Sequence, residues 1–275
     1  MFDLHVHAAP DVVGRWGGDV DVVDCYQAAG FRGCVIKGHY DTTAGRAVTA
    51  GVGRALRVYG GIVLNRHVGG FNPVAVSAAL QHGARVVWLP TADAHTQRAA
   101  GLPRLGGAGA GVPDVVYAAP PVDPTTAGPL RTIIRLVADA DAVLATGHLS
   151  GPEASWVLAE ARRAGLRRVL LTHPTYTVPG LTPAAAAELA AQGGHAEVTA
   201  YQLLHQPGCG PAMLRKVVEA VGYDRLVLSS DAGQPDSPPP PEALERLVDA
   251  LAGEGLDRGA LRAAASEIPE RLVTP

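Results

Sequence analysis

The chain has 275 residues, of which 47% are hydrophobic and 18% charged, and its formal net charge is -3. That length suffices for a large core, and α/β barrels of this size are commonly single domains. The charge and the lack of long basic runs exclude the pattern of a nucleic-acid or membrane-surface partner. No apolar run approaches the ~20 residues of a membrane span. Three cysteines without metal-site spacing predict a reducing, cytoplasmic location.

Apolar runs bounded by glycine, proline and polar residues predict eight buried strands. Most are continuous runs of Val, Ile, Leu and Ala, which is typical of parallel strands covered on both faces. They are expected at residues 2–8, 32–38, 57–64, 85–89, 142–146, 168–172, 195–199 and 225–229.

Helices are expected between these strands. Asn72 with Pro73 and Ser150 with Pro152 provide typical N-terminal signals for two of them. The helices are expected at residues 19–29, 42–52, 72–82, 125–138, 150–164, 182–192 and 211–221, then from the proline-rich stretch 235–241 to about residue 252, and near 257–265.

Eight such units predict a single-domain (β/α)8 barrel over residues 1–275. An open doubly wound sheet is the alternative, but it would carry a glycine-rich phosphate turn after its first strand. Residues 99–121 are rich in Gly, Ala and Pro and lack a clear period, so we expect a long loop or lid after the fourth strand.

Metal-ligating residue types stand at the predicted carboxyl ends of the strands. His5 and His7 alternate with apolar residues, so both side chains project from one face of the first strand. His148, His173 and Asp231 end the fifth, sixth and eighth strands. Because catalysis in a (β/α)8 barrel takes place at this rim, the pattern predicts one metal site.

Further polar residues are expected at the same rim. Lys37 stands on the second strand, and a buried lysine readily changes its pKa. The expected substrate contacts are Arg15, His39, Tyr40, Asn65, His67, Asp93 and Glu197.

The order His5-x-His7, His148, His173 and Asp231 over strands one, five, six and eight resembles the amidohydrolase superfamily, along the whole chain. Strings such as Ala-Thr-Gly-His-Leu-Ser (145–150) resemble a poorly characterised branch of it. The resemblance implies Zn²⁺, as one or two ions and with Mn²⁺ or Fe²⁺ as alternatives, held by these residues. It also implies that Asp231 is the general base.

One departure concerns the fourth strand. Binuclear members usually have a carboxylated Lys or a Glu there, whereas this strand ends Trp-Leu-Pro-Thr-Ala-Asp and Lys37 stands on the second strand. Three interpretations remain open. Lys37 is a carbamylated bridging ligand, or it is a cation that binds substrate, or the site holds a single metal.

The resemblance implies a hydrolase that cleaves a C–N or C–O bond of a small molecule, such as an amide, cyclic amide or lactone. A decarboxylase or lyase is an alternative. A phosphoesterase that opens on His-x-His is another, but such enzymes usually end on an Asp-x-His pair, and here Ala232 and Gly233 follow Asp231. A non-enzymatic binding barrel is least favoured, because ligand candidates stand on four strands. The sequence leaves homo-oligomerisation open.

Overall fold

The computed structural model describes residues 1–102, 105 and 114–275. Eight parallel strands pair in chain order, and a parallel bridge between Val6 and Ala232 closes the barrel. The predicted (β/α)8 fold is confirmed. The strands are β1 (Phe2–His7), β2 (Gly33–Lys37), β3 (Arg57–Val63), β4 (Val86–Trp88), β5 (Val143–Ala145), β6 (Val169–Leu171), β7 (Gly194–Thr199) and β8 (Leu226–Ser229).

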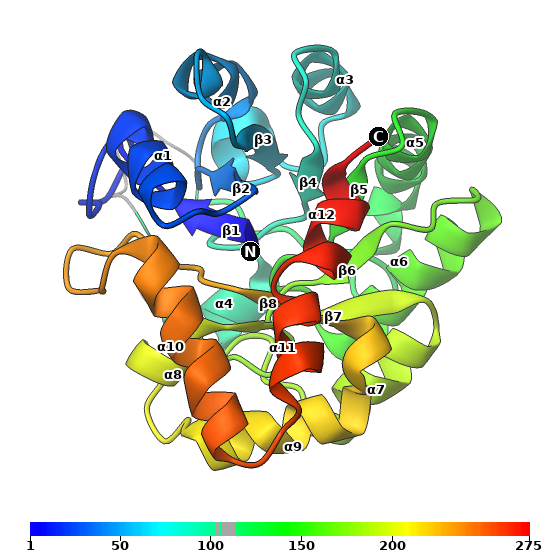
Figure 1. Ribbon diagram of the computed structural model, residues 1–275. Helices are drawn as coiled ribbons and strands as arrows, with labels where there is room; N and C mark the ends of the chain where they lie inside the picture. Colours follow the sequence, from blue (N-terminus) through cyan, green and yellow to red (C-terminus); the bar gives the residue numbers. More distant parts are fainter. Residues whose placement is uncertain (103–104, 106–113) are drawn as a thin grey trace.

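Helices surround this barrel (Figure 1). Those at the nine predicted places are α1 (Asp19–Ala28), α2 (Ala44–Gly51), α3 (Pro73–Gln81), α5 (Ala127–Asp139), α6 (Gly151–Arg163), α7 (Pro183–Ala191), α9 (Pro211–Val221), α10 (Pro240–Gly253) and α11 (Arg258–Ala264). Helices that the sequence pattern did not predict are α4 (His95–Ala99), α8 (Ala200–His205) and α12 (Glu267–Val273), with short 3-10 turns η1 (Arg66–Val68), η2 (Pro124–Thr126) and η3 (Tyr223–Arg225).

The insertion expected at residues 99–121 lies partly outside the described residues. Its described end returns to the rim beside β4, where Tyr117 N donates to Asp93 O over 2.8 Å and His95 N donates to Tyr117 O over 2.9 Å. Among the described residues, no helix is both long and apolar enough to span a membrane.

The outer helices are held by one apolar face each. On α5, Leu130, Ile133, Ile134 and Val137 are buried at the three- and four-residue spacing of a helix. Each fully buried side chain of this kind contributes about 1.5–3 kcal/mol relative to an exposed one. This packing fixes the strands, and with them the rim at which the strands end.

The last helix, α12, packs against the end of the barrel where the strands begin (Figure 1). Arginines placed just before strands hold its C-terminal carbonyls. Arg85 Nε donates to Val273 O over 2.7 Å, and Arg168 Nη1 donates to the carbonyls of Leu272 and Thr274 over 2.7 and 2.6 Å. Positive charge at a helix C-terminus is favourable, because the last carbonyls have no intrahelical partner.

We expect Arg168→Ala to lower the free energy of unfolding by about 2–3 kcal/mol, because it removes several charge-assisted hydrogen bonds to α12. Chemical denaturation monitored by circular dichroism measures this. Arg215→Ala is the control, since it breaks only exposed contacts, an ion pair with Glu219 and a hydrogen bond to Glu254 O, and should cost about 0.5 kcal/mol. Equal losses in the two variants would contradict this role of Arg168.

Candidate metal centre

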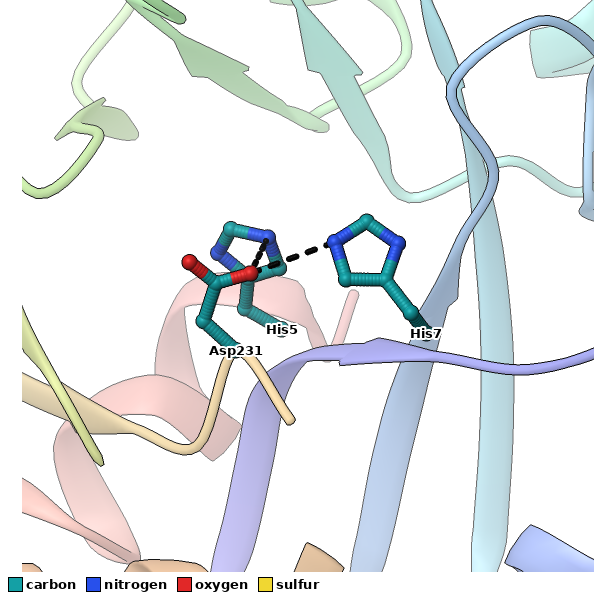
Figure 2. Close-up of side chains that lie close together, drawn as sticks. All are labelled: His5, His7 and Asp231. Carbon is teal, nitrogen blue, oxygen red and sulfur yellow. Dashed lines mark hydrogen bonds and ion pairs between the residues drawn. The ribbon is translucent and has the colours of Figure 1, made fainter. Parts of the chain in front are cut away.

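Three predicted ligands meet at the carboxyl ends of β1 and β8. Asp231 Oδ1 lies 3.0 Å from His5 Nε2 and 3.2 Å from His7 Nε2. Figure 2 shows the two imidazoles and the carboxylate pointing toward one another. One ligand atom of each residue lies within 4.8 Å of the other two, and all three residues are buried.

Glu197 on β7 orients His5 from behind. Its two carboxylate oxygens lie 3.2 and 3.3 Å from His5 Nδ1. Because a carboxylate accepts, Nδ1 of His5 carries the proton, and Nε2 faces Asp231. A carboxylate behind a histidine is the usual support of a metal-binding imidazole. Glu197, which we had expected to contact substrate, therefore lies behind His5.

His148 and His173 stand beside this trio at the ends of β5 and β6, with ring centroids 5.1 Å apart. His148 Nδ1 lies 3.0 Å from Gln97 Oε1, which turns the other ring nitrogen of His148 away from that amide. His173 Nε2 lies 3.8 Å from Asp231 Oδ2, and the buried Nδ1 of His173 has no hydrogen-bond partner among the described residues.

Lys37 reaches the same point from β2. Its Nζ lies 2.9 Å from His5 Nε2 and 5.5 Å from the centroid of the Trp88 ring on β4. Lys37 is 2% exposed. Burial lowers the pKa of the Lys37 amine, although Asp231 and Glu197 act in the opposite direction.

The electrostatics of the site favour a cation. Burial alone lowers the pKa of His5, but Asp231 and Glu197 raise it to about 9. Burial raises the pKa of Asp231, yet His5, His7 and His173 together hold it well below its usual range. Asp231 is therefore ionised. Burial holds the pKa values of His7 and His148 well below 6.5, so these imidazoles are neutral, as metal ligands must be.

The donor set fits a divalent ion of the zinc type. It combines imidazole nitrogens with one carboxylate, and the two carboxylates beside His5 favour positive charge there. His5, His7 and Asp231 would hold the ion, and His148 and His173 stand beside them.

A cavity of about 320 Å³ opens above these residues. Of the predicted substrate contacts, Arg15 and His39 line it, and His39 stacks on His7 with ring centroids 4.6 Å apart. Gln97, Tyr176 and Tyr201 also line the cavity, and the sequence pattern did not single them out.

The other predicted contacts lie elsewhere. Among the described residues, the cavity lining does not include Tyr40, Asn65, His67 or Asp93. Asn65 is buried and donates from Nδ2 to His39 O and Thr91 Oγ1, both over 2.9 Å, so it ties the loops after β2, β3 and β4 together. Asp93 accepts from Arg66 N over 2.8 Å, and the rings of Tyr40 and His67 are in tilted contact with centroids 3.9 Å apart.

Comparison with known sequences identifies the family of the chain. A model described as a family of unknown function (DUF6282) matches residues 1–197. The chain belongs to this family. The matched part includes every site residue discussed above except Tyr201 and Asp231. No curated protein matches the chain.

Solved structures share the barrel. A Pseudomonas putida protein described as a 2-pyrone-4,6-dicarboxylic acid hydrolase matches with 18% identity and a TM-score of 0.61, over 99% of this chain and 96% of that one. An amidohydrolase from Pseudomonas aeruginosa has 12% identity and a TM-score of 0.64, over 99% and 94%. An organophosphorus hydrolase from Deinococcus radiodurans has 14% identity and a TM-score of 0.63, over 99% of this chain and 92% of that one. The resemblance to amidohydrolases is thus confirmed for the fold.

We expect Glu197→Gln to raise the dissociation constant for Zn²⁺ about 10–100-fold, the usual cost of losing a carboxylate behind a ligating histidine. Competition with a chromophoric chelator measures this constant. His82→Gln, which changes an exposed histidine beyond the end of α3, is the matched control and should bind Zn²⁺ as the unaltered protein does. An unchanged constant in Glu197→Gln would show that His5 is not a ligand held in this way.

Proposed function

We propose that the protein is a metal-dependent hydrolase that cleaves a C–N or C–O bond of a small molecule. The supporting observation is the convergence of His5, His7 and Asp231, with Glu197 behind His5, beneath an open cavity. We propose Zn²⁺ as the ion, with His148 and His173 as further ligands. When bound, the ion supplies a Lewis acid and lowers the pKa of water from 15.7 toward about 7.

The residues of the chain would transfer the proton, orient His5 and position the substrate. Asp231, which is ionised and borders the cavity, accepts the proton of the attacking water and delivers it to the leaving group. Glu197 keeps His5 in one tautomer and orientation. The cavity walls hold the scissile bond above Asp231, and the burial of the surrounding side chains strengthens each electrostatic contact.

The cavity favours an anionic substrate, and we propose a lactone or cyclic amide that carries a carboxylate. Arg15 lines it, and Asp231, which would hold the ion, is the one carboxylate among the described lining residues. Arg15 Nη2 lies 3.2 Å from His7 Nδ1, and Arg15 is held by Asp11, so its guanidinium is fixed at the cavity wall. The P. putida protein of the same fold is described as acting on a pyrone dicarboxylic acid, which supports this class.

Lys37 is proposed as a carbamylated ligand. A protonated amine 2.9 Å from His5 Nε2 would repel an ion on that nitrogen, so the amine must lose its charge or move. The chain has 21 arginines but only two lysines, Lys37 and Lys216. A neutral lysine can add CO₂ and become a carboxylate, whereas an arginine keeps its charge. We also propose a cytoplasmic location, which the three free cysteines support.

We expect about two metal ions per chain by elemental analysis, falling to one or none in Lys37→Ala. A carbamate signal should appear in ¹³C NMR after equilibration with labelled bicarbonate, and it should be absent in the same variant. Lys216→Ala, which changes the exposed lysine on α9, should keep both. One ion per chain in both Lys37→Ala and Lys216→Ala, without a carbamate signal in either, would make Lys37 a cation of the substrate pocket.

We expect the Zn²⁺-loaded protein to hydrolyse members of a panel of carboxylated lactones and cyclic amides. Asp231→Asn should lower kcat by about 10²–10⁴-fold, the usual contribution of a general base. Product analysis decides the reaction, because hydrolysis takes up water whereas decarboxylation releases CO₂. Release of CO₂ without ring opening would replace the hydrolase by the decarboxylase alternative.

A further inference from the structure

A second cavity, of about 470 Å³, lies at the opposite end of the barrel from the metal centre. It is formed where α6 and α7 end and where β6 and β8 begin. Three arginines from separate segments line it: Arg162 in the last turn of α6, Arg167 in the loop before β6, and Arg225 in η3 before β8. We call it the arginine groove.

The arginine groove carries uncompensated positive charge. Among the described residues, none of these three guanidinium groups has an ion-pair partner, and no carboxylate lines the groove. Neighbouring arginines differ in this respect, since Arg163 pairs with Glu160 and Arg168 with Asp141. Such a concentration of charge is unexpected in a chain whose net charge is -3.

The groove also borders a buried histidine. His195 on β7 is 9% exposed, and its Nδ1 has no hydrogen-bond partner among the described residues. Burial lowers the pKa of His195 to about 4, and Arg225 contributes in the same direction. Even a buried histidine is therefore kept neutral beside this groove.

The floor of the groove is apolar and its rim is open. Leu158, Leu166 and Val169 are buried at the floor. Gly165 and Gly193 border it, and a Cβ atom at either position would meet nothing within 4 Å. Gln192 adds a polar group whose Oε1 accepts from Ser155 Oγ over 2.9 Å, which leaves its amide N–H groups as donors.

We propose that the arginine groove binds a small phosphorylated ligand with a planar ring, of the nucleoside diphosphate class. The planar forks of guanidinium groups match phosphate oxygens in pairs, and three of them can surround a polyanion. The apolar floor provides a surface for a ring, and the volume lies within the about 300–1,000 Å³ of small-molecule sites. A long nucleic acid needs a wider basic surface than three arginines on an acidic protein.

The arginine groove and the proposed hydrolase site lie at opposite ends of β6. Val169, the first residue of β6, lines the groove, and His173 follows the end of the same strand. Substitutions in the groove therefore leave the metal ligands intact.

Isothermal titration of the purified protein with ADP tests the proposal. We expect saturable binding that weakens with added salt, and at least tenfold weaker binding in Arg162→Ala, Arg167→Ala and Arg225→Ala. Arg246→Ala, which removes an exposed arginine paired with Glu242 on α10, should bind ADP unchanged. Because all four arginines are exposed, the substitutions should leave the melting temperature of the protein unchanged, which circular dichroism measures.

Other outcomes would overturn the proposal. Absence of ADP binding at millimolar concentration, or binding that survives all three arginine substitutions, excludes the groove as the site. Binding lost in Arg15→Ala but kept in Arg225→Ala places ADP in the metal-centre cavity. Inorganic pyrophosphate that binds as tightly as ADP excludes a role for the apolar floor. Tighter binding of a single-stranded oligonucleotide than of ADP replaces the small ligand by a nucleic acid.

Discussion

The closure between β1 and β8 is the constraint on which the candidate metal centre depends. Asp3 lies at this seam with no exposed surface, where an unpaired carboxylate would be very costly. It accepts from Ser230 N over 3.0 Å, from His5 N over 3.1 Å and from the Tyr26 hydroxyl. One of these donors belongs to His5, and another belongs to Ser230, the residue before Asp231. The same buried carboxylate that closes the barrel therefore fixes the distance between the first strand and the last.

Backbone conformation then aims the side chains at one point. His173 and Asp231 have φ values of 23° and 49°, in the left-handed region that costs most residues energy. Such strain persists only where the surroundings impose it. Here Asp231 N donates to His5 O over 2.8 Å. Gly233 follows with φ 118°, and a Cβ there would lie 2.1 Å from His7 O, so only glycine permits this approach.

The sequence was informative wherever pattern and position coincide. Buried parallel strands are continuous apolar runs, and a barrel brings the ends of all eight to one rim, so His5, His148 and Asp231 were predictable as neighbours. Helix α12 was not, because its support comes from Arg85 and Arg168, which lie more than a hundred residues away in the chain. The six residues of α8 are too few for a periodic pattern. The role of Glu197 depends on depth in the barrel, and a strand pattern does not distinguish a residue that touches substrate from one behind a ligand.

If Lys37 is the carbamylated ligand that we propose, the site keeps its chemistry while the chain position of the lysine changes. The position on β4 that faces His5 is occupied by Trp88, whose ring centroid lies 5.9 Å from that of His5. A ligand from β4 is thereby excluded at this depth, and the long side chain of Lys37 crosses the Trp88 ring from β2 to reach the same point. Burial lowers the pKa of the amine and so favours its neutral form, although Asp231 and Glu197 act in the opposite direction. A shorter side chain would not reach His5, and an arginine could not give up its charge, so the proposed carbamylated ligand at position 37 would have to be a lysine.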